Sequence, residues 1–240
     1  MKEYVFFGIR FIDGDFKSIK LLIDKGGLLV LPAAPALKEI DNNIKYHNAL
    51  KHADIALFDS GFFCILLNFL KKIKVKKYSG LKFLKEFLLS QKNTSNMILS
   101  IDPSNKDKII NNKYLKSIGI KNFFHYIAPI YQSDLIEDKV LLNIINKRKP
   151  KYIIINLGGG TQELLGSYLK TNLNYKPSII CSGAAIAFFT GQQARIPLFF
   201  DKIYIGWLIR IIFNPFVFLP RYTKAFKLIF LMKHIKNNNN

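Results

Sequence analysis

The stretch YIIINLGGGTQELLGSYL, residues 152–169, decides the fold. It opens with an apolar run, Tyr152–Asn156, which has the length of a buried strand. Three glycines follow, Gly158–Gly160, and the next residues have the apolar spacing of a helix. A glycine turn between a strand and a helix lets the backbone approach a ligand closely, and the amides that open the helix favour an anion. The stretch predicts an α/β unit, and its turn is either an anion site or a plain connection.

The same alternation of short apolar runs and helical segments extends along the chain. Residues 134–148, for example, carry Ile136, Val140 and Ile144 at a spacing of four, with Leu141 and Ile145 beside them, and this predicts a helix with an apolar stripe. Strands that alternate with helices predict a mostly parallel sheet with helices on both faces. The predicted strands are Leu28–Leu31, Ile55–Phe58, Met97–Ile101, Phe123–Ile127, Tyr152–Asn156 and Ser178–Cys181.

The composition indicates an anionic partner. The 240 residues include 36 Lys and Arg against 16 Asp and Glu, a formal net charge of +20. Such a balance favours a nucleic acid, a phosphorylated small molecule or an acidic membrane surface. Cys64 and Cys181 lie far apart in apolar surroundings, which predicts buried thiols and neither a disulfide nor a metal site.

The pattern changes near residue 195, which predicts two domains, 1–195 and 196–240. The second segment is rich in aromatics and carries seven cations and one anion between residues 196 and 236. Pro215 and Pro220 break it into short helices, so we expect a helical appendage that either associates with anionic membrane or packs on the sheet with its lysines in solvent. No signal peptide is predicted, since the apolar run before Arg10 is too short, and no membrane span is predicted, since polar residues interrupt the longest uncharged run, 177–194. We therefore expect a cytoplasmic protein, which a membrane-associated appendage would make peripheral at an acidic membrane face.

Several common site motifs are missing. There is no GxGxxG spacing, no phosphate loop ending in Gly-Lys-Ser/Thr, no HExxH and no GxSxG. Their absence disfavours, respectively, a nicotinamide dehydrogenase, a nucleoside triphosphatase, a zinc hydrolase and a serine hydrolase. The tripeptide Asp13–Asp15 resembles a metal-diphosphate motif, although a turn is the commoner role for such residues.

Residues that directly follow the strands are the candidates for a site, since open parallel sheets bind ligands beyond the carboxyl ends of their strands. Asp59 is prominent among them, because it ends a buried strand just before a new apolar segment. An acid in that position is either a helix cap or a catalyst. The segments in question are Pro32–Pro35, Asp59–Gly61, Ala128–Tyr131, Gly158–Glu163 and Ser182–Ala185.

Six short motifs, in this order, resemble the WecG/TagA/CpsF family of bacterial glycosyltransferases between about Leu28 and Tyr222. They are ALKHADIALFDSG (49–61), YSGLKFL (78–84), INLGGGTQE (155–163), CSGAAIAFFTGQQARIP (181–197), GWLIRIIFNP (206–215) and RY (221–222). The resemblance implies a Rossmann-like α/β fold with a C-terminal appendage. It also implies transfer of a sugar from UDP to a lipid-diphosphate-linked acceptor, with inversion, in surface polysaccharide synthesis. The sugar would be an N-acetylhexosamine such as N-acetylmannosamine, or its uronic acid.

The resemblance also implies roles for individual residues. Asp59 would be the general base that takes the proton of the attacking hydroxyl. The arginines Arg195, Arg210 and Arg221 would neutralise the leaving diphosphate, so that neither a metal nor a cofactor is expected. The nucleotide would bind at Gly158, Gly159, Gly160, Gln162, Glu163 and Gly183.

The chain also departs from the family pattern. Pro32–Ala34 replaces a T-x-N segment near the donor sugar, Ser60 interrupts a D-G pair, and Gly206 and Asn214 each replace a Glu. Because of these changes, the identity of the donor sugar is open, and the chain is either an active enzyme or an inactive homologue. The oligomeric state is also open, and a homo-oligomer is one alternative. From another functional class, the alternative is a basic protein that binds nucleic acid or another polyanion without catalysis.

Overall fold

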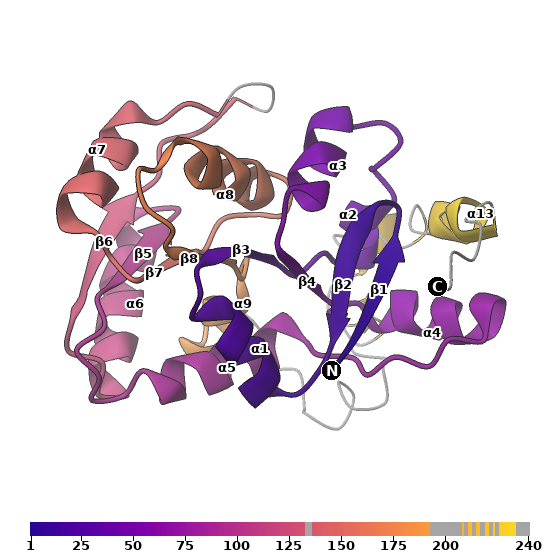
Figure 1. Cartoon of the computed structure of the whole chain (residues 1–240), viewed down its shortest axis with the longest axis horizontal. Helices are drawn as coiled ribbons and strands as arrows, with labels where there is room; N and C mark the ends of the chain where they lie inside the picture. Colours follow the sequence, from indigo (N-terminus) through magenta and orange to yellow (C-terminus); the bar gives the residue numbers. More distant parts are fainter. Residues whose placement is uncertain are drawn as a thin grey trace.

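The computed structural model of the chain describes residues 1–132, 136–192, 208, 211–212, 215–216, 219–220, 223 and 226–233. The described residues form an eight-stranded sheet in the order β1-β2-β4-β3-β8-β7-β5-β6 (Figure 1). Its strands are β1 (Lys2–Phe6), β2 (Ile9–Asp13), β3 (Gly27–Val30), β4 (Ile55–Leu57), β5 (Ile98–Asp102), β6 (Phe123–Ile127), β7 (Tyr152–Ile155) and β8 (Ser178–Cys181).

Seven of the described strands, β2 to β8, are parallel to one another. The remaining strand, β1, is antiparallel to its neighbour, β2. Phe7 and Gly8 join β1 to β2, and both have positive φ, 57° and 72°. A two-residue loop of this conformation matches the twist of a hairpin. The hairpin extends the sheet at one edge and was not predicted from the sequence.

Helices cover both faces of the sheet. In Figure 1, α3, α7 and α8 lie on one side of it, and α1, α5, α6 and α9 lie on the other. Each layer encloses its own buried apolar cluster, and α2, α4 and α13 contribute to the cluster beneath α3 and α8. The helices are α1 (Phe16–Ile23), α2 (Ala34–Leu37), α3 (Ile44–Lys51), α4 (Gly61–Lys71), α5 (Gly80–Ser90), α6 (Asn105–Ser117), α7 (Lys139–Arg148), α8 (Thr161–Asn172), α9 (Ala185–Phe189) and α13 (Lys227–Lys233).

The connections diverge between β5 and β7, which are neighbours in the sheet. From β5 the chain continues outward through α6 to β6, and from β7 it returns through α8 to β8 on the opposite face. Such a divergence opens a crevice at the carboxyl ends of the two strands, which is where ligands bind in open α/β sheets. The glycine turn after β7 lies at this point.

The α/β fold predicted from the sequence is confirmed, and each of the six predicted strands is present within one residue of its expected bounds. One helix differs from its prediction. It begins at Lys139, where the Asp138 side chain caps it by accepting a hydrogen bond from the Leu141 amide. Its buried line is Leu141 and Ile145, whereas Val140 is 63% exposed, so the helix faces the sheet with the residues beside the expected stripe and not with Val140.

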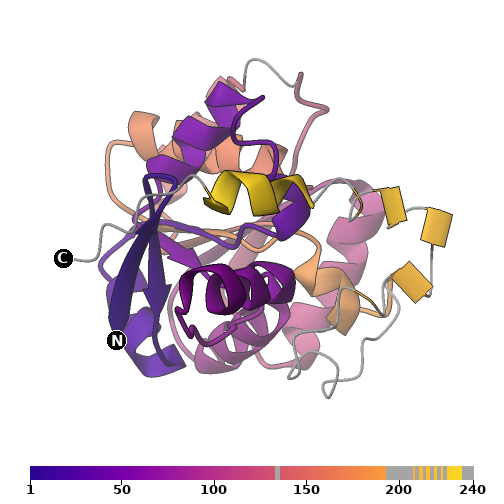
Figure 2. The same cartoon turned by 90° about the vertical axis from the view of Figure 1, so that its right-hand side faces the viewer.

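Helix α13 belongs to the C-terminal segment, and it packs against α4 (Figure 2). Leu228 and Met232 are fully buried there, within the same apolar cluster as α3 and α8. This part of the 196–240 segment is therefore bound to the sheet domain. Among the helices of the described residues, none has both the length and the apolar character that a bilayer crossing requires.

Candidate functional site

Four of the predicted strand-end segments lie side by side at one edge of the sheet. They follow β4, β3, β8 and β7, which are neighbours in that order. Asp59 stands after β4, and the glycine turn Gly158–Gly160 stands after β7. Three strand spacings of about 4.8 Å put these two about 14 Å apart along the edge. An elongated ligand could contact both ends of this row.

The glycine turn faces open space. A Cβ atom built on Gly158, Gly159 or Gly160 would meet no atom of the described residues within 4 Å, apart from the adjacent residues of the chain. Crowding by the protein therefore does not explain why glycine stands at these positions. Only Gly160 needs glycine for its backbone, since its φ is +94°. Binding of a ligand in front of Gly158 and Gly159 stays a prediction.

Gln162 and Glu163 brace this turn from behind. Glu163 accepts hydrogen bonds from the Gly160 amide at 2.6 Å and from Gln162 Nε2 at 2.9 Å. Gln162 Oε1 accepts a bond from the amide of Gly183, which follows β8, at 2.6 Å. Both side chains are buried, and burial raises the pKa of Glu163. The pair thus ties the turn after β7 to the turn after β8, while its contact with a nucleotide stays a prediction.

Asp59 does not cap the helix that follows it. Ser60 does so, since its Oγ accepts a hydrogen bond from the Phe63 amide. Asp59 Oδ1 instead accepts a bond of 2.7 Å from the Gly80 amide at the first residue of α5. The carboxylate is partly exposed at the carboxyl edge of the sheet. One oxygen thus has a fixed structural partner at the first residue of α5, and a catalytic role for Asp59 stays a prediction.

The three predicted arginines, Arg195, Arg210 and Arg221, lie outside the described residues. The aspartates of the tripeptide Asp13–Asp15 are described, and both have structural partners. Asp13 accepts a hydrogen bond from the Lys76 amide, and Asp15 caps α1 by accepting from the Ser18 amide. Across the described part of the chain, no group of three or more His, Cys, Asp and Glu side chains could hold a metal.

Sequence reasoning missed Asp102, although it ends β5 in the same way that Asp59 follows β4. Its carboxylate is fully buried and is surrounded by hydrogen-bond donors. Oδ1 accepts from Ser100 Oγ at 2.9 Å, Asn111 Nδ2 at 2.7 Å and Asn156 Nδ2 at 3.0 Å. Oδ2 lies 2.5 Å from His125 Nδ1. These residues, the Asp102 network, connect β5, β6, β7 and α6 beside the glycine turn.

A family model, the glycosyl transferase WecG/TagA/CpsF family, matches residues 7–240, which is nearly the whole chain. The chain belongs to the WecG/TagA/CpsF family. A comparison with curated proteins gives no match. Membership makes the protein a glycosyltransferase of cell-wall polysaccharide synthesis, which in general uses a sugar donor and a lipid-linked acceptor. The resemblance inferred from the six motifs is thereby confirmed.

Two of the departures from the WecG/TagA/CpsF pattern, Pro32–Ala34 and Ser60, lie in the row of strand ends, whereas Gly206 and Asn214 lie outside the described residues. Pro32–Ala34 follows β3, between Asp59 and Gly183 along the edge. Ala33 occupies the N-cap position of α2 and forms no side-chain hydrogen bond there. Pro32–Ala34 thus provides no polar side chain in the middle of the row, and its effect on the choice of donor sugar stays a prediction.

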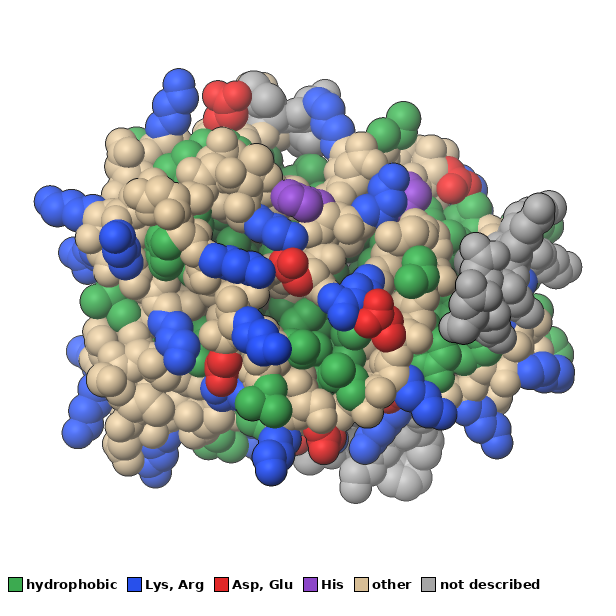
Figure 3. Space-filling view, viewed as in Figure 1, with side chains coloured by type: hydrophobic (Ala, Val, Ile, Leu, Met, Phe, Trp, Pro, Cys, Tyr) green, Lys and Arg blue, Asp and Glu red, His purple; other side chains and the backbone are tan. Residues whose placement is uncertain are grey.

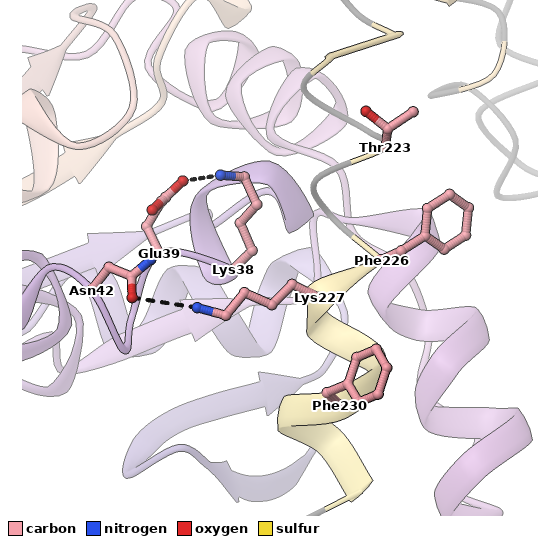
Figure 4. A pocket seen from close by; sticks show the side chains of 7 residues that line it. All are labelled: Lys38, Glu39, Asn42, Thr223, Phe226, Lys227 and Phe230. Atoms are coloured by element: carbon pink, nitrogen blue, oxygen red, sulfur yellow. Dashed lines mark hydrogen bonds and ion pairs between the residues drawn. The ribbon is translucent and has the colours of Figure 1, made fainter.

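A separate groove of about 580 Å³ lies between α2 and the C-terminal segment (Figure 4). Phe226 and Phe230 line one wall, and their side chains are 50% and 65% exposed. Lys227 bonds to Asn42 Oδ1 across the groove. The remaining lining residues are Lys38, Glu39 and Thr223. This groove combines aromatic rings with cations, and it is distinct from the row of strand ends.

Proposed function

We propose that the protein transfers an N-acetylhexosamine, such as N-acetylmannosamine or its uronic acid, from UDP to a lipid-diphosphate-linked acceptor with inversion. The observation that carries this proposal is the glycine turn Gly158–Gly160. It lies at the divergence of β5 and β7, faces open space and precedes the N-terminus of α8. An anion is stabilised there by the backbone amides and the helix dipole. The diphosphate of UDP is such an anion.

The order of the strand ends along the sheet edge then determines how the UDP-sugar lies. With the diphosphate at the turn after β7, the sugar extends past Gly183 and Pro32–Ala34 toward Asp59. Asp59 accepts the proton from the attacking acceptor hydroxyl. A general base of this kind contributes a factor of about 10²–10⁴ to the rate. Its bond to the Gly80 amide holds the carboxylate in one orientation.

Neutralisation of the leaving diphosphate falls to Arg195, Arg210 and Arg221 in this proposal, without a metal. Guanidinium groups bind phosphate oxygens with paired hydrogen bonds, and fixed cations stabilise the charge that develops as the bond to the sugar breaks. The support for this step is the match of the three arginines to appendage arginines of the WecG/TagA/CpsF family, since these residues lie outside the described part of the chain.

The acceptor is anchored in lipid, so the enzyme has to work at a membrane surface, and we assign the docking to the C-terminal segment. Phe216 and Phe230 are 93% and 65% exposed, and the segment from 196 to 236 has a net charge of +6. Lysine and arginine side chains are spread over the face seen in Figure 3, with few acidic residues among them. Exposed rings among cations favour an acidic bilayer. The protein would then be peripheral on the cytoplasmic face.

A thermal-shift panel of nucleotides and nucleotide sugars tests the donor assignment. UDP and one UDP-N-acetylhexosamine should raise the melting temperature, since a ligand that binds only the folded state stabilises it. CMP and ADP should have much smaller effects. The variants Gln162→Ala and Glu163→Ala should weaken UDP binding because they loosen the turn. No shift with any uridine nucleotide would refute the proposal.

A further inference from the structure

Burial of the Asp102 network costs more free energy than burial of an apolar contact of the same size would. The Asp102 carboxylate is 0% exposed, and removal of a charge from water is repaid only when donors surround it closely. Four donors do so here. Nevertheless, within the described part of the chain, His125 Nε2, Asn111 Oδ1 and Asn156 Oδ1 are buried without a hydrogen-bond partner. A partly satisfied polar network stabilises a fold less than apolar packing does.

The network's position indicates what it contributes instead. Asn156 follows β7 directly and stands two residues before Gly158, the first residue of the glycine turn. Its backbone amide donates to the Ile101 carbonyl at 3.0 Å, and its side chain donates to Asp102 Oδ1 and Ser100 Oγ, each at 3.0 Å. The base of the turn is thus held to β5 by both main chain and side chain.

Asp102 also fixes the other side of the crevice. Its carbonyl accepts a hydrogen bond from the Ala128 amide after β6, and its carboxylate holds Asn111 in the middle of α6. The strand ends of β5, β6 and β7 therefore share one anchor at the point where the connections diverge. From behind, Glu163 and Gln162 restrain the same turn. The turn is restrained from two sides, and the space in front of it is open.

We propose that Asp102 is a positioning residue for the donor: through Asn156 it holds the Gly158–Gly160 turn in the geometry that receives the diphosphate. This inference rests on the proposed function, since it takes UDP to bind at that turn. Asp102 itself is buried and touches no substrate. Binding groups need a supporting shell that fixes them to within a fraction of an ångström, and the network supplies that shell on the β5 side.

The variant Asn156→Ala tests the link, because it breaks the bond to Asp102 and leaves Ser100, Asn111 and His125 in place. It should weaken UDP binding about tenfold and raise the KM for the donor by a similar factor, with kcat changed less than about twofold, since Asp59 lies three strands away. Calorimetric titration with UDP and steady-state transfer assays measure these quantities.

Ser178→Ala is the matched control. Ser178 is also buried, and its hydroxyl donates to the Ile23 carbonyl, but it starts β8 at the opposite edge of the sheet. It should lower the melting temperature about as much as Asn156→Ala does, and it should leave UDP affinity unchanged. If both variants weaken UDP binding equally, the network is merely structural and the inference is wrong.

Two further outcomes are informative. Asp102→Asn keeps an oxygen for Asn156, so it should fold, and it should weaken UDP binding by only about threefold. Unchanged UDP affinity in a folded Asn156→Ala variant, or in Asp102→Asn if the first variant does not fold, would overturn the inference. A wild-type protein that binds no UDP would instead refute the proposed function.

Discussion

Replacement of Asp59 by Asn separates a catalytic role from a structural one. The side chain keeps its size and one oxygen, so the bond from the Gly80 amide, now 2.7 Å long, is retained in a neutral form. Hydrogen bonds to charged groups contribute about 1.5–3 kcal/mol, and neutral ones contribute about 1 kcal/mol. The expected loss of stability is therefore about 1 kcal/mol, which lowers the melting temperature of a chain of this size by about 2–4 °C.

The expected effect on catalysis is much larger. If Asp59 takes the proton from the acceptor hydroxyl, Asp59→Asn should lower turnover by about a hundredfold or more, while UDP affinity stays unchanged. The assay is transfer of labelled sugar to a lipid-diphosphate acceptor, with UDP binding measured calorimetrically on the same preparation.

Ser79→Ala provides the control for the structural part. Ser79 caps α5 by accepting a hydrogen bond from the Lys82 amide, one residue before Gly80. Loss of such a cap also costs about 1 kcal/mol. This variant should therefore melt like Asp59→Asn and keep its turnover. Turnover of Asp59→Asn within about threefold of wild type, at the same lowered melting temperature, would show that Asp59 only anchors α5.

Three other predictions concern the rest of the chain. Burial raises the pKa of Glu163 above the ordinary glutamate value of 4.5, so over a range of pH above 4.5 the folded state holds a proton that the unfolded chain releases. As the pH rises above 4.5, wild type should lose stability relative to Glu163→Gln, and thermal melts with no pH-dependent difference would contradict this. Transfer should survive EDTA, whereas a loss restored by manganese would assign the diphosphate to Asp13 and Asp15. Replacement of both Phe226 and Phe230 by Ser should reduce sedimentation with anionic vesicles, and unchanged sedimentation would exclude them from docking.

Most of the sheet could be predicted from the sequence because its strands are buried on both faces and read as short apolar runs. Tyr152–Ile155 and Ser178–Cys181 are of this kind. The β1–β2 hairpin was missed because Phe7 adopts a positive φ, a conformation that side chains rarely favour. No glycine or asparagine pair marks that turn in the sequence.

The candidate site was predictable to the extent that it follows from strand order. The rule that ligands bind beyond the carboxyl ends of strands identifies Asp59 and the glycine turn. It applies equally to Asp102, so the signal for that residue was present in the sequence. The bracing of the turn was not predictable, since Gln162 bonds to Gly183 and Asn156 bonds to Asp102 across 21 and 54 residues. Contacts of such separation depend on the order of the strands in space.

The most direct test of the central claim, that the donor binds in front of the glycine turn, is a calorimetric titration of Gly159→Leu with UDP. A Cβ at this position meets no atom of the described part of the chain within 4 Å, adjacent residues aside, and its φ lies outside the range that requires glycine, so the variant should fold and melt like wild type. The leucine side chain would occupy the space assigned to the diphosphate. The account predicts a wild-type melting temperature with UDP affinity reduced by about a hundredfold or more. Wild-type UDP affinity in this variant would contradict it.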